Sequence, residues 1–407
     1  MAKKKQIKKR PAGGRKTLTR KHHISIFAVL VIILVAVAAI LQMVDQGRAS
    51  GDPVIVAVGD IACDPTDASY NGGNGTATNC RMKATSDLAL SINPTNVVIL
   101  GDNQYENGTL SAFQASYDPT WGRLKAITKP AVGNHEYQTP GATGYYDYFG
   151  AAAGDRSKGY YSYNLGAWHM IVLNSNCTYV ACGVGSAQEA WLRADLASHT
   201  QTCTLAYWHH PRFSSGAEHG NNTLVQPLWQ ALHEARADVI LTGHDHTYER
   251  FAAQRADGVA DGSAPTEFVI GTGGKNHYAF GAIKVNSLAH NNTNYGVLKM
   301  TLHSASYDWQ FIAEGGGIAD SGTAACVVPS PVSPSAPAPA AAPASPVAKS
   351  SAAKTTTSAA PGALSSAAEA VQPGESSDVS PAAQAKKDKA AKTRAQSAEP
   401  KRNFFEQ

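Results

Sequence analysis

The sequence predicts a mixed α/β domain with a core of two mixed β-sheets and with helices outside. Early in the chain, apolar β-branched runs alternate with helical patterns, which is typical of βαβ units and parallel sheet. Later strand patterns follow one another without helices between them, which indicates antiparallel pairing. Residues 54–313 are long enough for one large domain. A mixed two-sheet core accommodates all of these observations.

The expected elements follow from short apolar runs and from apolar residues at helical spacing. Strands are expected at residues 54–58, 97–100, 169–174, 204–208, 239–242, 267–271, 297–302 and 306–311. Helices are expected at residues 81–92, 110–126, 188–198 and 224–235. The first strands therefore alternate with helices, and their carboxyl ends should meet at one edge of a sheet.

Five short segments each place a hard metal ligand at the end of a probable strand. They are Val58-Gly59-Asp60, Gly101-Asp102-Asn103-Gln104-Tyr105, Gly133-Asn134-His135-Glu136, Trp208-His209-His210-Pro211 and Gly243-His244-Asp245-His246. Carboxylate, amide oxygen and imidazole are ligand types that hold pairs of divalent or trivalent ions. Each segment alone also fits a turn or a surface histidine, but the ordered set of five indicates a metal site.

This ordered set resembles that of the calcineurin-like metallophosphoesterases, over about residues 54–313. Within that superfamily the chain is most similar to the purple acid phosphatases. Most members carry a histidine two residues after the first aspartate, where this chain has Ala62. The purple acid phosphatases lack it and supply a tyrosine three residues after the second aspartate, here Tyr105. The resemblance implies a four-layer α/β/β/α sandwich of the short, single-domain bacterial type.

The resemblance also implies two metal ions bridged by Asp102. The first would be completed by Asp60, Tyr105 and His246, and the second by Asn134, His209 and His244. A phenolate is a hard anionic ligand, which favours Fe(III) at the Tyr105 position. Two imidazoles and an amide suit a divalent ion, Fe, Zn or Mn, at the second position.

The implied activity is hydrolysis of phosphate monoesters by attack of a metal-bound hydroxide, as in an acid phosphatase. His135 is the candidate general acid for the leaving oxygen, and His210 is a second candidate catalytic residue that contacts the phosphate or lies behind the ligands. Glu136 either orients His135 or faces solvent, and Asp245 should point away from the metals. His219 lies in a Gly- and Asn-rich loop expected to rim the mouth of the site, where it would either contact the substrate or, as we expect, be solvated.

Other functions are compatible with parts of this pattern. A phosphodiesterase or nucleotidase would use the same two metals, and a non-catalytic envelope-associated protein could retain the fold. A protein Ser/Thr phosphatase is disfavoured, because no arginine follows Asp102 closely. The natural substrate and the oligomeric state do not follow from the sequence.

The amino-terminal segment predicts export. Residues 1–23 are basic, and residues 24–44 are uncharged and almost wholly apolar. At about 1.5 Å per residue this span can cross the ~30 Å hydrocarbon layer, with the basic end in the cytoplasm. Its length favours an uncleaved membrane anchor over a cleaved signal peptide. In either case residues 51–326, the catalytic domain, would be extracytoplasmic, membrane-anchored or secreted.

Residues 327–407 are rich in Ala, Pro, Ser and Lys and show no periodicity, so we expect a disordered tail. Its lysines either remain solvated or contact an anionic envelope. Residues 49–326 hold 15 basic and 24 acidic residues, a net charge of −9. That charge disfavours nucleic acid as a partner and leaves a phosphorylated small molecule as the expected substrate.

All six cysteines fall in the exported part, which suggests three disulfides. Fifteen pairings are open. The set we consider joins Cys63 to Cys80, Cys177 to Cys182 and Cys203 to Cys326. No pair of closely spaced thiolate pairs is present, which disfavours a zinc site.

Overall fold

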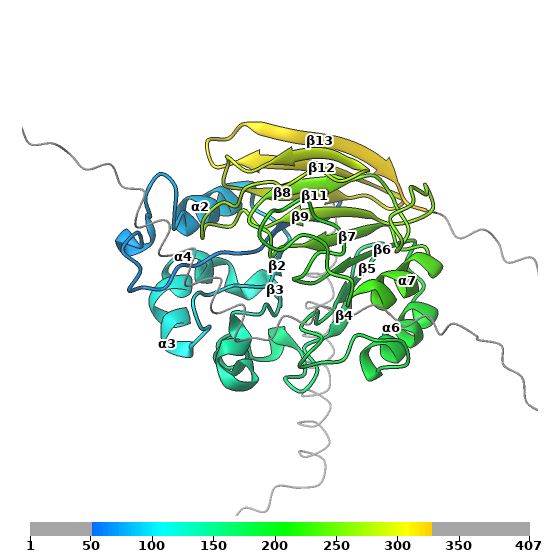
Figure 1. Ribbon diagram of the computed structural model, residues 1–407, viewed down its shortest axis with the longest axis horizontal. Coiled ribbons are helices and arrows are strands. Elements are labelled where there is room, and N and C mark those ends of the chain that lie inside the picture. The colour runs from blue at the N-terminus through cyan, green and yellow to red at the C-terminus, as the bar shows by residue number, and fades with distance from the viewer. Residues whose placement is uncertain (1–50, 328–407) are drawn as a thin grey trace, which may run out of the picture. The chain divides into compact units, whose positions relative to one another are not determined.

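The computed structural model describes residues 51–327, and two mixed β-sheets form the centre of this region (Figure 1). The first sheet has the strand order β13-β12-β11-β1-β2-β3, and the second has the order β10-β8-β9-β7-β6-β5-β4. The strands of the first sheet are β1 (Val54–Val58), β2 (Asn96–Leu100), β3 (Thr128–Ala131), β11 (Gly296–Leu302), β12 (Ser306–Ala313) and β13 (Ile318–Ala325). The strands of the second sheet are β4 (Tyr161–Leu165), β5 (Trp168–Val172), β6 (Cys203–Tyr207), β7 (Val239–Thr242), β8 (Tyr248–Phe251), β9 (Thr266–Ile270) and β10 (Ser287–Asn291).

Each sheet combines a parallel centre with antiparallel neighbours. Strands β1, β2 and β3 run parallel, and β11, β12 and β13 pair antiparallel beside β1. In the second sheet β5, β6, β7 and β9 run parallel, while β4, β8 and β10 pair antiparallel. The carboxyl ends of these seven parallel strands therefore lie on the same side of their respective sheets, where ligands bind in folds of this class.

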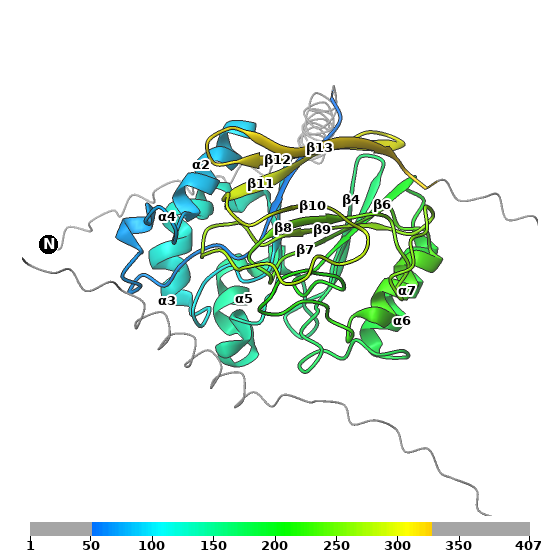
Figure 2. The ribbon, with the colours of Figure 1, turned by 45° about the horizontal axis from the view of Figure 1, so that its top comes forward.

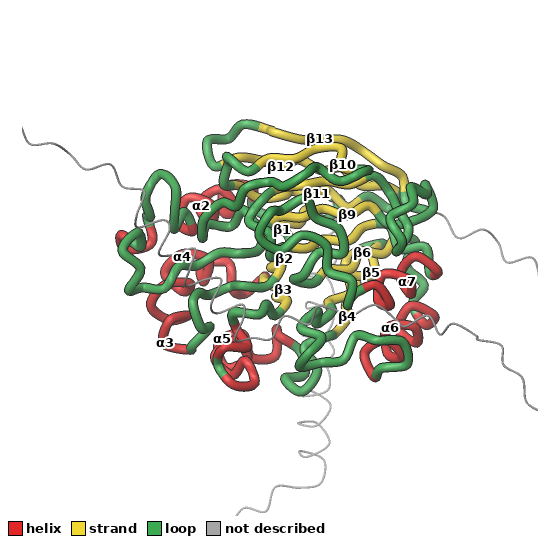
Figure 3. Tube along the Cα trace, viewed as in Figure 1, coloured by secondary structure: helices red, strands yellow, loops and turns green. Residues whose placement is uncertain are grey.

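The helices lie outside the two sheets, as Figure 3 shows by colour. They are α2 (Met82–Ile92), α3 (Leu110–Ala112), α4 (Asp118–Thr120), α5 (Thr143–Phe149), α6 (Ala187–Ser198) and α7 (Gln226–Glu234). Helices α6 and α7 cover one side of the second sheet, and α2 lies against β11 of the first (Figure 2). The two sheets with their outer helices confirm the expected α/β sandwich.

Side-chain alternation separates the core into two clusters. On β7, Val239 and Leu241 point into the interior between the sheets, where they join residues such as Val56 of β1. Ile240 between them joins the other cluster, which includes Trp229 of α7. Because both faces of β7 are buried, the strand reads in the sequence as a continuous apolar run.

All eight expected strands are present, within one or two residues at their ends. The sequence reasoning missed β3, β4, β8, β10 and β13, and the short helix α5. Strand β3 contains Lys129 and Pro130, and β13 contains mostly small and polar residues that give no apolar alternation.

The helix expected at residues 110–126 is wrong as a single element. It breaks into α3, a wider turn at Phe113–Tyr117, α4 and a tighter 3-10 segment at Trp121–Ile127. Pro119 lies within this stretch and lacks the N–H that a continuous helix would use, which is consistent with the irregular path.

The structure contains the three disulfides considered from the sequence. The Cys63–Cys80 bond closes the loop that precedes α2, and the Cys177–Cys182 bond closes a smaller loop. Cys203, at the start of β6, joins Cys326, just after β13, so this bond links the two sheets.

The expected membrane span at residues 24–44 and the expected tail at residues 328–407 lie outside the described residues. Between residues 51 and 327, none of the helices has the length and apolar character needed to cross a bilayer.

Candidate metal centre

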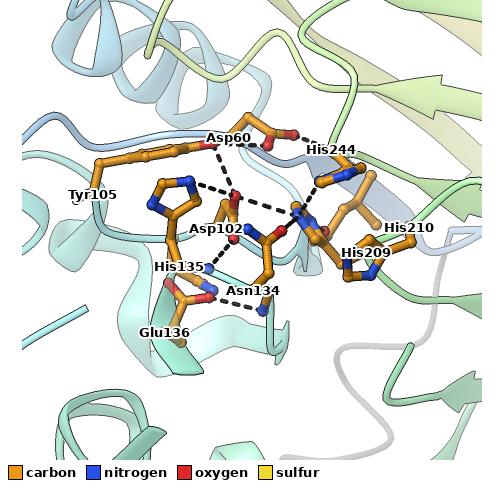
Figure 4. Close-up of polar contacts among 12 residues, drawn as sticks. Asp60, Asp102, Tyr105, Asn134, His135, Glu136, His209, His210 and His244 are labelled. Atoms are coloured by element: carbon orange, nitrogen blue, oxygen red, sulfur yellow. Dashed lines mark hydrogen bonds and ion pairs between the residues drawn. The ribbon is translucent and has the colours of Figure 1, made fainter. Parts of the chain in front are cut away.

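The seven residues predicted as metal ligands converge on one place at the carboxyl ends of the strands, and Figure 4 labels all of them except His246. Four of them follow strands of the first sheet: Asp60 follows β1, Asp102 and Tyr105 follow β2, and Asn134 follows β3. The three histidines come from the second sheet: His209 follows β6, and His244 and His246 lie between β7 and β8. The site is thus assembled from both sheets.

One group of ligand atoms surrounds the phenol of Tyr105. Its hydroxyl oxygen lies 2.9 Å from Asp60 Oδ1, 3.1 Å from Asp102 Oδ2 and 2.9 Å from His246 Nε2. Tyr105 is almost fully buried. Burial, together with the charges of Asp102 and Asp60, raises the pKa of Tyr105 well above its ordinary value, so the phenol keeps its proton unless a cation displaces it.

A second group surrounds the ring of His209. Its Nε2 lies 2.9 Å from Asn134 Oδ1, 3.1 Å from His244 Nδ1 and 3.3 Å from Asp102 Oδ2. Burial lowers the pKa of His244, and the neighbouring histidines lower it further, so that imidazole is neutral and suited to coordination.

Asp102 belongs to both groups, because its Oδ2 atom faces both the Tyr105 hydroxyl and His209 Nε2. Burial opposes charge on the Asp102 carboxyl, but the charges of His209 and His135 outweigh it and hold the pKa of Asp102 below its ordinary value. The same pairing outweighs burial at His209 and raises the pKa of His209 to about 9. In the absence of cations, Asp102 and His209 therefore form a buried ion pair.

Hydrogen bonds to Leu100 and Asn276 determine which nitrogen His209 and His246 turn toward the other ligands. His209 donates its Nδ1–H to the carbonyl oxygen of Leu100 at 2.9 Å, so Nε2 is the nitrogen that faces Asn134 and Asp102. His246 Nδ1 lies 3.1 Å from Asn276 Oδ1, which likewise leaves Nε2 toward Tyr105. Such partners are typical of metal-binding histidines, since they set the tautomer and the ring orientation.

Glycines allow the ligand-bearing turns to approach one another. A Cβ atom on Gly133 would lie 2.1 Å from Asp102 Oδ1, and one on Gly101 would lie 2.6 Å from the His209 ring. Asp60, Asp102 and His244 themselves have positive φ angles of 62°, 45° and 70°. Non-glycine residues rarely adopt this conformation, and it is concentrated at functional sites.

His135 lies beside Tyr105, with a ring-centroid separation of 4.3 Å. It donates Nδ1–H to the carbonyl oxygen of Glu106, and its Nε2 lies 3.8 Å from Asp102 Oδ2. Its side chain keeps partial exposure to solvent. The structure therefore places His135 at the edge of the ligand group, with Nε2 toward Asp102.

Both interpretations of Glu136 from the sequence are wrong. The side chain neither faces solvent nor orients His135, because it is fully buried and accepts N–H bonds from Gln104 at 3.1 Å and Gly133 at 2.8 Å. Glu136 thus ties the turn after β2 to the turn after β3. Burial and the nearby Asp102 raise the pKa of Glu136 to about 7.

His210 lies on the side of the second group. One ligand atom each of His209, His210 and His244 lies within 4.8 Å of the other two. His210 Nδ1 is 2.8 Å from Ser175 Oγ, and burial lowers the pKa of His210 well below its ordinary value. Asp245, in contrast, points away from the ligands, as expected, and contacts Ser214.

Two residues of irregular loops stack on proposed ligands, a role that the sequence did not indicate for either of them. His219 is exposed, as expected, but its ring also stacks on that of His244 at 3.9 Å, so it is more than a solvated loop residue. Tyr278 stacks on His246 at 3.9 Å. Neither residue follows a strand, and their loops give no periodic signal, so only the folded chain shows that they belong here.

The chemistry of this donor set fits a pair of metal ions. With metal–ligand bonds of about 2.1 Å, adjacent ligand atoms at right angles around one ion are about 3 Å apart. The contacts of 2.9–3.3 Å within each group match that spacing. The shared carboxylate matches a bridging ligand between two ions.

Comparison with known proteins agrees with this geometry. The family model described as calcineurin-like phosphoesterase matches residues 38–248. Purple acid phosphatase 15 of Arabidopsis thaliana is 26% identical over 242 residues, which cover 48% of this chain and 45% of that protein. The Fe(3+)-Zn(2+) purple acid phosphatase 12 of the same plant is 27% identical over 211 residues, 44% of each protein. The chain spans about half the length of the curated relatives it matches.

Among solved structures, purple acid phosphatase PPD1 from yellow lupin seeds superposes with a TM-score of 0.56 at 19% identity. The superposition covers 68% of this chain and 54% of that one, and it supports the fold. The family model covers more than half of the chain and includes all five ligand-bearing segments. The chain therefore belongs to the calcineurin-like phosphoesterase family, and its likeness within that family is to the purple acid phosphatases.

Proposed function

We propose that this protein is an exported, acid phosphatase-like enzyme that hydrolyses phosphate monoesters at a centre of two metal ions. The observation that carries the proposal is the division of the seven side chains into two groups that share Asp102. Similarity to purple acid phosphatases supports the reaction class.

The proposed ligands of the two ions follow from these groups. Asp60, Tyr105 and His246 would hold the first ion, Asn134, His209 and His244 the second, and Asp102 both. The phenolate favours Fe(III) at the first position, and the neutral donors favour divalent Fe, Zn or Mn at the second. The similar plant protein named Fe(3+)-Zn(2+) purple acid phosphatase 12 supports a mixed centre.

When bound, the two ions would neutralise the charge of the phosphate and make a water molecule more acidic. The chain's own residues would then bind the phosphate and handle protons. His135 keeps its Nδ1–H on the carbonyl oxygen of Glu106, so Nε2 is the nitrogen that would face the leaving ester oxygen. The imidazolium form of His135 would donate its Nε2 proton to that oxygen. His210 and His219 would contact the phosphate from the side of His244, against which both rings lie.

Export is proposed on separate grounds. Three disulfides among the described residues are typical of proteins that fold in an oxidising compartment. The apolar segment at residues 24–44 would direct the chain there and anchor it in the membrane, or be removed as a signal.

A substrate panel tests the proposal. Wild-type protein shown by elemental analysis to hold two metal ions is assayed on an aryl phosphate monoester, a diester and a nucleotide. We expect the monoester to give the highest kcat/KM. Asp102→Ala should lower that value by about 10³-fold or more, because both ions lose a ligand and their charges are lost from the transition state.

The matched control is Asp195→Ala, which also removes an aspartate bonded to a histidine, but on α6 and outside the group of ligands. That variant should keep both its metal content and its activity. Preference for the diester would identify a phosphodiesterase, and a dimetal protein inert on every phosphate ester would contradict the proposal.

A further inference from the structure

The segment after His209 is buried although it forms neither helix nor strand. Residues 211–215 are all buried, and the chain stays irregular until α7. Buried backbone N–H groups need hydrogen-bond partners, and an irregular segment cannot find them in its own ladder. Residues 212–220 are called the histidine loop here because they include His219. Side chains on β8, on β9 and in the turn between β7 and β8 accept four of its backbone N–H groups.

The partners are three fully buried carboxylates, which we call the carboxylate clamp: Asp245, Glu249 and Glu267. Glu267, on β9, begins the contact at the start of the histidine loop. Its Oε1 accepts the N–H of Arg212 and its Oε2 accepts the N–H of Phe213, each at 3.0 Å. A carboxylate has two acceptor oxygens and no donor, so it suits two successive N–H groups.

The other two members hold the next residues and the far end. Glu249, on β8, accepts the N–H of Ser215 at 2.7 Å and its hydroxyl at 2.6 Å. Asp245 accepts the Ser214 hydroxyl at 2.5 Å and the N–H of Gly220 at 3.1 Å. Gly220 directly follows His219, so the carboxylate clamp holds the histidine loop on both sides of that residue.

The fit between the histidine loop and the carboxylate clamp is close. A Cβ atom on Gly216 would lie 2.3 Å from the Asp245 carboxyl. Burying three carboxylates is costly unless their hydrogen bonds are made. These three buried carboxylates lie against the histidine loop, the segment that brings His219 onto the ring of His244.

We propose that the carboxylate clamp is a positioning device that holds His219 over the metal centre, where it engages the phosphate group of the substrate. Asp245, Glu249 and Glu267 are then positioning residues, which act on the reaction through His219. The inference rests on the proposed function, because His219 can contact a phosphate group only if a phosphate ester binds beside His244.

Glu267→Gln is the test variant, since it conserves shape but sets an amide NH₂ against one of the two backbone N–H groups. Asp238→Asn is its matched control. Asp238 is also buried and accepts two backbone N–H groups, from Thr204 and Val327, but it directly precedes β7, at the end of that strand away from the site. Both variants should lose thermal stability to a similar extent.

The measurement is a double-mutant cycle with His219→Ala, using kcat/KM on an aryl phosphate monoester at equal metal content. We expect Glu267→Gln to lower kcat/KM about tenfold, because small misplacements of a substrate-contacting group are costly. Asp238→Asn should change it less than twofold. In the His219→Ala background, Glu267→Gln should have less than a twofold effect. If Glu267→Gln does not fold, Ser214→Ala replaces it in the cycle, because it removes one hydrogen bond to Asp245. Ser214→Ala should then lower kcat/KM in the wild-type background and have less than a twofold effect in the His219→Ala background.

A readout independent of activity is the imidazole NMR signal of His219 in the metal-free protein. Glu267→Gln should shift or broaden it, and Asp238→Asn should not. Equal losses of kcat/KM from Glu267→Gln in both backgrounds would overturn the inference, as would an unchanged His219 signal. A dimetal wild type without turnover would contradict the proposed function instead, and the NMR comparison would then decide whether the carboxylate clamp positions His219.

Discussion

The three disulfides close loops of very different length, and removing the disulfide of a longer loop should destabilise the domain more. The perturbation is replacement of both cysteines of one pair by alanine, in three separate double variants. Cys203–Cys326 spans 123 residues, Cys63–Cys80 spans 17 and Cys177–Cys182 spans 5. Because a cross-link restricts the unfolded chain, the longest loop should contribute most.

The magnitudes follow from the loop lengths. The chain-entropy relation gives about 5 kcal/mol for Cys203–Cys326, about 3 kcal/mol for Cys63–Cys80 and about 2 kcal/mol for Cys177–Cys182. The lost side-chain packing is similar in the three cases, since at least one cysteine of each pair is buried. The expected difference between the extreme variants is therefore about 3 kcal/mol.

Urea denaturation under oxidising conditions measures these differences through the free energy of unfolding. The wild type treated with reductant is the control. It lacks all three disulfides, so it should be less stable than each of the three double variants. The reasoning fails if loss of Cys177–Cys182 destabilises as much as loss of Cys203–Cys326, or if the latter variant unfolds at the wild-type urea concentration.

Three further predictions concern the site, pH and the ends of the chain. Iron-loaded wild type should be coloured by phenolate-to-Fe(III) charge transfer, and Tyr105→Phe should bleach the visible band at an unchanged melting temperature; a colourless ferric wild type would remove Tyr105 from the ligand set. Burial raises the pKa of Asp238 to about 6 in the folded state, so its contribution to stability is greatest below pH 3.8 and is lost as pH rises through 6, by about 3 kcal/mol in all. Urea titrations from pH 4 to 7 should show a smaller slope for Asp238→Asn than for wild type, and equal slopes would refute the assignment. A protein of residues 51–327 should keep the specific activity and melting temperature of the full chain at equal metal loading, as assayed side by side; aggregation or loss of most activity would show that the domain limits are wrong.

The parts of the fold that could be predicted are those with a local signal. Strands such as β1 and β7 are buried on both faces, so their apolar runs stand out. Strand β13 alternates exposed and half-buried small residues and depends on its pairing with β12, which no local pattern indicates. The prediction of one helix at residues 110–126 was wrong, because the spacing of apolar residues does not reveal where an α-helix changes to a π or a 3-10 turn.

The site divides in the same way. Its proposed ligands could be predicted because each follows a strand in a short motif. The stacking of His219 on His244 could not, because it depends on a long irregular loop held from a distant strand. Glu136 was misread because its partners, the N–H groups of Gln104 and Gly133, become neighbours only when β2 and β3 pair.

The assembly of the site from both sheets has a consequence for how the sandwich is held together. Asp102 and Asn134 come from the first sheet and His209 from the second, so a bound ion would join the sheets at the carboxyl ends of their strands. The disulfide from Cys203 to Cys326 joins the sheets near the opposite end of β6. The sandwich would then be fastened at both ends, by coordination at one and by a covalent bond at the other. Chelation would reopen only the coordinated end, and part of the metal-binding free energy would count as folding free energy.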